Sequence, residues 1–238
     1  MAADLVISVA MIAGIVLVSE AVRRAAKRLC SEDYRIYLVE AVSTFQLCAC
    51  THELKLLGEL GRIESNVGLT LTYIMSTVHI STFHGASCNP AVIVEHLCRG
   101  TTSAKGAAVI ICVQFAAAVV AQFAVAAVWS LGLSDLHTRH QKFGYRCFDP
   151  IGGTLLQAAA VESACAFCMT AMTMHIHRVD EKLRSHAAAA LITFLVYAGG
   201  HISGAFFNAV LAFSTQFPCS GHSYPEYCFV YWLGPVLG

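Results

Sequence analysis

Two short stretches decide the fold of this chain: Gly85-Ala86-Ser87-Cys88-Asn89-Pro90-Ala91 and Gly204-Ala205-Phe206-Phe207-Asn208-Ala209-Val210. Both contain the pattern Gly-Ala-x-x-Asn, and each follows a long apolar run. An asparagine in this position caps a helix, because its side-chain oxygen accepts from the first backbone N–H groups. In the first stretch Pro90 stands at the first helical position, where its missing N–H costs nothing. The repeated cap predicts two half-helices whose positive ends meet inside a membrane.

The surroundings of the two stretches are duplicated as well. Glu40 lies 49 residues before Asn89, and Glu162 lies 46 residues before Asn208, each glutamate within an apolar run. This spacing predicts a unit of two spanning helices followed by a re-entrant half-helix, present twice. An odd number of spans separates the copies, so they should insert with opposite orientation. The half-helices would then enter from opposite faces.

Composition places the chain in a membrane. Of its 238 residues, 57% are hydrophobic and only 13% are charged, and the mean hydropathy is +0.64. A soluble protein would carry roughly twice this charged fraction. The net charge is zero and there is no long basic block, which argues against nucleic-acid binding. We therefore expect an all-α membrane protein.

The apolar runs divide the chain into four parts: an N-terminal apolar segment with a basic linker (1–34), a first repeat (35–131), a connecting loop (132–150) and a second repeat (151–238). Spans are expected at 36–57, 67–83, 107–131, 152–174 and 187–200, with half-helices at 89–98 and from 208 onward. The final run, 227–238, would rise only ~20 Å as a helix. Either this last helix stops partway across the bilayer or the chain is incomplete.

Residues 5–22 form a further apolar run before the first repeat. Basic residues follow it at 23–28 and none precedes it, which is the reverse of a cleaved signal peptide. We expect an uncleaved span with its N-terminus facing away from the cytosol; the alternative is an interfacial amphipathic helix. Loops 23–34, 99–105 and 175–186 would then be cytosolic and hold most of the Lys and Arg, as the positive-inside rule requires. The opposite loops hold Arg62, Arg139, Lys142 and Arg146.

These motifs resemble the aquaporin family. The resemblance rests on Asn89-Pro90-Ala91-Val92, the repeated glutamate, His201-Ile202-Ser203-Gly204-Ala205 and Tyr231-Trp232-Leu233-Gly234-Pro235. Finer features resemble its unorthodox superaquaporin branch, among them Thr51-His52-Glu53-Leu54 and Cys219-Ser220-Gly221-His222. The resemblance implies an aquaporin-like inverted repeat with an extra N-terminal helix and a truncated last helix. It also implies a homotetramer with one pore per subunit and an address in an intracellular membrane, often the endoplasmic reticulum.

Two positions depart from the pattern of the family. The second motif has Ala209 where the family has proline; alanine is the best helix former, so the half-helix should survive with a less rigid first turn. Position 211 holds an arginine in the filter of orthodox members, and here it is Leu211. By spacing, Val196 and Ala205 also face this constriction. We expect a wider, more apolar filter that passes glycerol or hydrogen peroxide along with water.

The pore motifs have a mechanism in this interpretation. Asn89 and Asn208 cap the half-helices with their oxygens and donate from their NH₂ groups to a passing water. The half-helix dipoles oppose cations and protons. Glu40 and Glu162 are intramembrane carboxylates that must be paired or hydrogen-bonded. They are either structural braces, which accept from backbone N–H groups of the re-entrant loops, or functional groups that serve as a proton relay or as catalytic acids; we favour the braces.

The remaining chemistry-bearing residues give weaker signals. Most of the eleven cysteines lie inside apolar runs, where cysteine acts as a small hydrophobe. Cys147 and Cys219 fall in loops on one side and can pair as a disulfide if that side is oxidising. We expect no metal site and no cofactor. The alternatives to a channel are a non-conducting structural membrane protein on the same fold, and an intramembrane enzyme, for which no nucleophile–base constellation is present.

Overall fold

The protein is described here from a computed structural model, which places residues 2–61, 63–217 and 219–238. Arg62, expected in a loop opposite the cytosolic side, lies outside these residues. The helices are α1 (Ala2–Leu29), α2 (Glu32–Leu60), α3 (Ser65–Thr82), α4 (Pro90–Cys98), α5 (Ala104–Ser130), α6 (Asp135–Lys142), α7 (Leu155–His175), α8 (Arg184–Ser203), α9 (Ala209–Thr215), α10 (Tyr224–Cys228) and α11 (Gly234–Leu237), with the 3₁₀ turns η1 (Ile176–Arg178) and η2 (Glu181–Leu183) and the π-helical segment η3 (Phe229–Leu233). Within the described ranges the fold is all-α, as expected.

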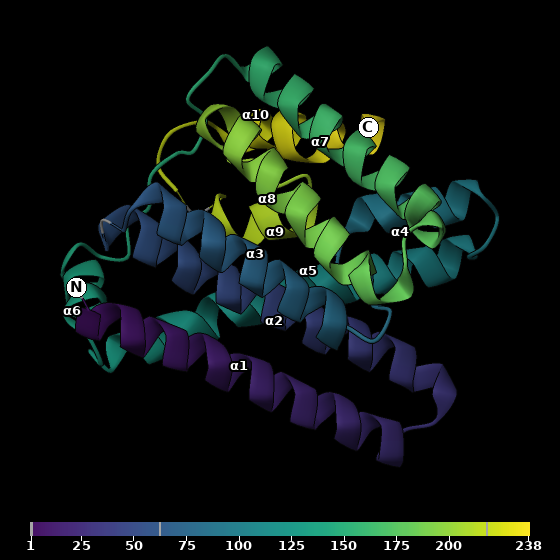
Figure 1. Ribbon diagram of the computed structural model, residues 1–238, viewed down its shortest axis with the longest axis horizontal. Helices are drawn as coiled ribbons and strands as arrows, with labels where there is room; N and C mark the ends of the chain where they lie inside the picture. The colour runs from purple at the N-terminus through teal and green to yellow at the C-terminus, as the bar shows by residue number, and fades with distance from the viewer. Residues whose placement is uncertain (1, 62, 218) are drawn as a thin grey trace.

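The long helices form a bundle around the two half-helices. α1 packs along α2, α2 against α5, α3 against α8, and α8 against α7 (Figure 1). The half-helices α4 and α9 both contact α5 and also contact each other. The expected arrangement, two repeats with one re-entrant half-helix each, is therefore confirmed.

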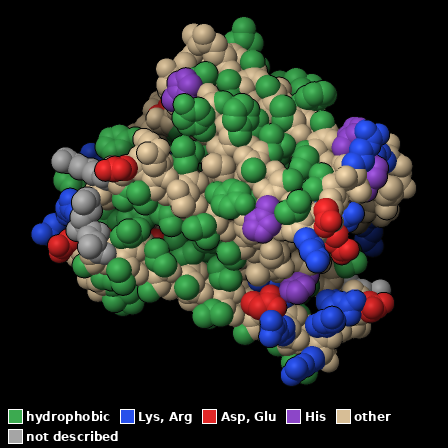
Figure 2. Space-filling model, viewed as in Figure 1, with side chains coloured by type: hydrophobic (Ala, Val, Ile, Leu, Met, Phe, Trp, Pro, Cys, Tyr) green, Lys and Arg blue, Asp and Glu red, His purple; other side chains and the backbone are tan. Residues whose placement is uncertain are grey.

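Among the residues that the structure describes, four helices are long and apolar enough to cross a membrane: Ala3–Leu29, Ala104–Ser130, Leu155–Arg178 and Glu181–Ser203. The expected spans in α2 and α3 do not meet that standard of composition. For α2 the reason is visible in the fold, because polar side chains such as Gln46 and Glu53 are fully buried among neighbouring helices. The mean hydropathy of α2 thus understates how apolar its outer face is. Figure 2 shows the charged side chains gathered at the two ends of one face, with an apolar middle.

Helix α1 is joined to the bundle by polar side chains at both ends. Near its N-terminus, Ser8 donates to Glu53 of α2 at 2.6 Å. Near its C-terminus, the buried guanidinium of Arg23 donates to Gln46 at 2.7 Å, and Gln46 donates on to Thr82 at the end of α3 at 3.1 Å. Buried hydrogen bonds to charged groups are worth about 1.5–3 kcal/mol each. The N-terminal apolar segment is therefore a packed member of the bundle.

The short C-terminal run is also well packed. It begins at Tyr224, three residues earlier than expected, and continues through a π-helical segment to Leu237. The hydroxyl of Tyr231 donates to the carbonyl of Ser203 at 2.6 Å, and Ser163 donates to the carbonyl of Gly234 at 2.6 Å. These bonds join the C-terminal segment to the middle of α7 and to the last residue of α8.

Candidate functional site

The two half-helices begin at the predicted asparagines. Asn89 has extended backbone, and its Oδ1 accepts from the N–H of Ala91 at 3.0 Å, while Pro90 occupies the first position of α4. Asn208 caps α9 in the same way and accepts from two N–H groups, those of Val210 at 3.1 Å and Leu211 at 3.3 Å. Both helices thus direct the positive ends of their dipoles toward the middle of the bundle.

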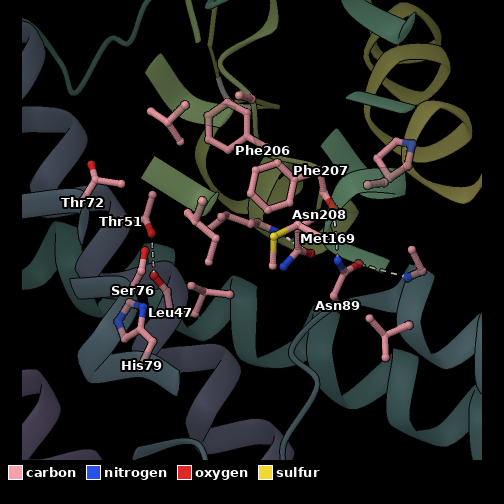
Figure 3. A pocket seen from close by; sticks show the side chains of 18 of the residues that line it. Leu47, Thr51, Thr72, Ser76, His79, Asn89, Met169, Phe206, Phe207 and Asn208 are labelled. Atoms are coloured by element: carbon pink, nitrogen blue, oxygen red, sulfur yellow. Dashed lines mark hydrogen bonds between the residues drawn. The ribbon is translucent and has the colours of Figure 1, made fainter. Parts of the chain in front are cut away.

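The two asparagines also exchange hydrogen bonds across the centre. Asn89 Nδ2 donates to the carbonyl of Phe207 at 3.0 Å, and Asn208 Nδ2 donates to the carbonyl of Cys88 at 2.8 Å (Figure 3). Each asparagine therefore bonds to the residue that precedes the other. An amide NH₂ has two N–H groups, so one on each side chain remains for another acceptor.

The residues that precede the asparagines have unusual backbone. Cys88 has φ 52° and Phe207 has φ 37°, both in the left-handed region that side chains other than glycine seldom adopt. Such conformations cost about 1–3 kcal/mol and persist only where the surroundings fix them. Strain is therefore stored on both sides of the centre.

The two intramembrane glutamates bond to these strained residues. Glu40 accepts from the N–H of Ser87 at 3.1 Å and of Cys88 at 2.6 Å. Glu162 accepts from the N–H of Phe206 at 3.0 Å and from that of Phe207. Both carboxylates are buried. Each thus bonds to the backbone of the re-entrant loop in its own repeat, which is the geometry that a structural brace requires.

A cavity of about 1460 Å³ surrounds the centre and is lined by residues from α2, α3, α4, α7, α8 and α9. Asn89, Ala91 and Asn208 line it, and the filter candidates Leu211, Val196 and Ala205 line it too. Pro90, Ala209 and Val210 are buried beside it and take part in the half-helices themselves. The structure therefore brings the sequence-derived pore and filter residues to one space.

Several lining residues were not assigned to the pore by the sequence analysis. Thr72, Met75, Ser76 and His79 line the cavity from α3. Their spacing of three and four residues is that of one helix face, which is a signal that could have found them. This spacing is a weak signal, because a threonine in an apolar helix can donate to a carbonyl of its own helix instead of facing a cavity. Thr72 does so to the carbonyl of Gly68 at 3.0 Å.

A second face was missed on α2, where Leu47, Thr51 and Lys55 line the cavity at intervals of four residues. Figure 3 shows Thr51 on the same side of the cavity as Thr72 and Ser76, with Phe206 and Phe207 opposite. The lining is thus mainly apolar, with hydroxyl and amide groups and a few imidazole and charged groups.

The predicted disulfide is present in the structure, between Cys147 and Cys219. It joins the connecting loop to the segment that follows α9. Beside it Asp149 accepts from the N–H and the ring of His222, and from the N–H of Ile151 at 2.9 Å. Burial raises the pKa of Asp149, but these hydrogen bonds outweigh it and hold the pKa below its ordinary value. The C-terminal side of α9 is therefore fixed to the connecting loop.

Comparison with known proteins identifies a family and several similar chains. The Major intrinsic protein family model matches residues 32–238. Aquaporin-11 of Homo sapiens is 42% identical over 202 residues, which cover 85% of this chain and 74% of that protein. Aquaporin-12 of Mus musculus is 34% identical over 226 residues (93% and 78%), and aquaporin-11 of Milnesium tardigradum is 27% identical over 220 residues (86% and 73%).

Proposed function

The chain belongs to the major intrinsic protein family, whose aquaporin members are membrane channels, and on that premise we propose that it passively conducts water and small uncharged solutes. The observation that carries the proposal is the reciprocal pair Asn89–Phe207 and Asn208–Cys88 at the middle of the cavity. The pore would run along this cavity, through the point where the two half-helices meet.

The asparagines supply the selectivity of the central region. Each side chain keeps one N–H, so two donors face a water molecule that passes between the loops. Donors on both sides orient the oxygen of that water toward the centre, and the two half-helix dipoles raise the energy of any cation there. The crossed hydrogen bonds hold both amides in place. The two amides are therefore already oriented when a solute arrives, and the protein does not need to reorganise as it passes.

The filter candidates set the class of solute. Leu211, Val196 and Ala205 present only apolar side chains to the cavity. An arginine at position 211 would narrow the passage and add five donors, whereas leucine adds none. We propose that this constriction passes glycerol and hydrogen peroxide as well as water.

The proposal extends to the oligomeric state and the subcellular location of the protein. We propose a homotetramer with one pore per subunit in an intracellular membrane, such as the endoplasmic reticulum or a vesicle membrane. We also take residues 35–131 and 151–238 as the two repeats, with 1–34 and 132–150 as the added segments. Cross-linking in native membranes tests the tetramer, and co-localisation with organelle markers tests the address.

One feature favours a second candidate, a non-conducting structural membrane protein. Ala209 leaves the first turn of α9 less rigid than Pro90 leaves that of α4. If the second half-helix moved, the crossed hydrogen bonds would be lost and the passage would not stay open. A structural protein would keep the fold and have no permeability.

Osmotic light scattering separates the two candidates. The full chain is reconstituted in liposomes, and shrinkage in impermeant sucrose is compared with that of empty liposomes. Glycerol gradients and an encapsulated peroxide dye follow on the same vesicles. We expect faster shrinkage in sucrose, followed by reswelling in glycerol. Rates equal to those of empty liposomes would favour the structural protein, and water flux without glycerol or peroxide flux would refute the proposed filter.

A further inference from the structure

Two polar side chains on the α3 wall of the cavity have no partner among the residues that the structure describes. The imidazole of His79 is only 7% exposed, and its buried Nε2 makes no hydrogen bond to those residues. Ser76, one turn earlier on the same face, makes no side-chain hydrogen bond to them either. Both side chains line the cavity. Because buried polar groups are nearly always hydrogen-bonded, this pair points to a partner that enters the cavity.

The free hydroxyl of Ser76 sets it apart from its neighbours on α3. Other hydroxyl side chains of this helix donate to the carbonyl four residues earlier, as serine and threonine commonly do in helices. These are Thr70, Thr72, Thr77, Ser81 and Thr82. Ser76 makes no such bond, so its donor and its acceptor lone pairs both remain available to the cavity.

The imidazole of His79 is held in one orientation by stacking. Its ring lies against that of Phe83, with the centroids 5.0 Å apart and the planes inclined by 15°. Nε2 donates or accepts according to the tautomer, so it can bond to either end of a hydroxyl group. A side chain that is already ordered loses little conformational freedom when a ligand arrives. The ring is therefore prepared for binding.

The walls of the cavity differ in polarity around this pair. Figure 3 shows Ser76 and His79 on the same side as Thr51 and apart from the two asparagines, with the rings of Phe206 and Phe207 across the cavity. A solute that carries hydroxyl groups on one side and C–H groups on the other gains from both walls. Water gains only from the polar wall. The arrangement therefore favours a small polyol over water at this position.

We propose that Ser76 and His79 form a solute-binding subsite on α3, separate from the asparagines, which takes two hydroxyl groups of a polyol, one on each side chain. Residues three positions apart on a helix have Cβ atoms about 5–6 Å apart, a spacing that two hydroxyl groups of one small molecule can bridge. The choice of polyol rests on the proposed function, in which glycerol is a solute of the cavity. Binding itself requires no conduction, so the subsite and the channel can fail separately.

A purely structural role for His79 makes the opposite prediction for stability. A buried nitrogen without a partner lowers stability, and phenylalanine removes both ring nitrogens while keeping an aromatic ring against Phe83. If the imidazole is present for a ligand, His79→Phe should raise the unfolding midpoint of the ligand-free protein by about 2–4 °C. If a ring nitrogen supports the fold, the midpoint should fall.

The test measures glycerol binding to the full chain by saturation-transfer difference NMR. The protein is kept in an amine-oxide detergent, because its headgroup has no hydroxyl group that could compete. The variants are His79→Phe and Ser76→Ala. The matched controls make the same changes at exposed positions that do not line the cavity: His175→Phe on α7 and Ser81→Ala on α3. Water and glycerol fluxes are measured on liposomes that hold the wild type.

We expect His79→Phe and Ser76→Ala each to raise the dissociation constant of glycerol about tenfold, the factor that a lost hydrogen bond of ~1.4 kcal/mol produces. Both controls should keep the wild-type value. A wild type that binds no glycerol, or an unchanged dissociation constant in His79→Phe, overturns the subsite and leaves the channel in place where liposomes pass water. If His79→Phe fails to fold, an unchanged constant in Ser76→Ala overturns it. Liposomes that pass no water, with glycerol binding that depends on Ser76 and His79, overturn the channel and support the subsite.

Discussion

The two half-helices are copies of one motif, but they are held in different ways. α4 has nine residues, begins with Pro90, and its asparagine makes one capping bond. α9 has seven residues and begins with Ala209, and its asparagine makes two. The C-terminal end of α9 is in addition held by other helices: Gln122 of α5 donates to the carbonyl of Ser214 at 2.7 Å, and Lys55 donates to Thr215.

This difference shows how a degenerate copy keeps its geometry. A proline ring limits the backbone in the unfolded chain as well as in the folded one, so the first copy needs little further support. The second copy lacks the ring and gains side-chain bonds and a disulfide just beyond its end. In α4 the rigidity comes from the local sequence, whereas in α9 it comes from tertiary contacts. Each of these contacts can be removed by a separate substitution.

The largest expected effect concerns the glutamate braces. Glu162→Leu should cost about 3–5 kcal/mol, because it leaves the buried N–H groups of Phe206 and Phe207 without an acceptor. Glu40→Leu should cost less, because the amide of Gln114, whose nitrogen donates to Glu40 at 2.7 Å and to Ser87 Oγ at 3.2 Å, can rotate and present its oxygen as a replacement acceptor. Thermal unfolding in detergent, followed by the folded fraction in size-exclusion chromatography, measures both.

The matched controls are Glu162→Gln and Glu40→Gln, which keep one acceptor and should lie between wild type and leucine. Equal losses of stability in Glu162→Leu and Glu40→Leu would contradict the idea that the second repeat has fewer replacement acceptors than the first.

The next largest effect concerns the disulfide. Cys147→Ser should destabilise the protein by about 2–4 kcal/mol, because the bond closes a loop with a sequence separation of 72 residues. A reductant should lower the unfolding temperature of the wild type and leave that of Cys147→Ser unchanged. Cys98→Ser is the control, since Cys98 is free and exposed at the end of α4. Reductant sensitivity that persists in Cys147→Ser would show that another bond is responsible.

A smaller effect is expected from the contact between α5 and α9. Gln122→Leu removes the donor to the carbonyl of Ser214 and should cost about 1–2 kcal/mol. Water flux should also fall, because the free end of α9 then moves relative to Asn208. Gln141→Leu on the exposed face of α6 provides the control. A loss of stability without any loss of flux would mean that the position of α9 does not depend on its C-terminal end.

The smallest effect tests the missing proline directly. Ala209→Pro should stabilise the protein by about 0.5–1 kcal/mol, and Pro90→Ala should destabilise it by a similar amount. Asn208 has φ −149° and ψ 109°, the extended backbone that a residue before proline favours. Chemical denaturation in detergent can resolve differences of this size between matched pairs. Destabilisation by Ala209→Pro would show that the tertiary contacts of α9 have fixed a first turn that proline cannot adopt.

The sequence predicted the parts of this fold that depend on local chemistry. The asparagine caps, the repeated glutamates and the order of the helices follow from short motifs and long apolar runs. The crossed bonds between Asn89 and Phe207 could not be predicted, because they depend on how closely two loops from opposite faces approach.

The lining of the cavity was predicted only in part. Leu211 followed from the resemblance to the aquaporin family, but Thr51 and Lys55 did not, because nothing in the sequence tells which face of α2 turns inward. The buried carboxylate of Glu53 also gave no usable signal. It accepts from Trp129 at 2.6 Å and His137 at 3.0 Å, and these partners are 76 and 84 residues away in the chain.

The central claim is that solutes pass where the two asparagines meet, and the water permeability of liposomes that hold Asn89→Trp tests it most directly. A bulky ring at this point should close the passage and reduce shrinkage to the rate of empty liposomes. Phe123→Trp, at a position that is 72% exposed on α5, should keep the wild-type rate. Folded Asn89→Trp protein that conducts water as fast as the wild type would contradict the account.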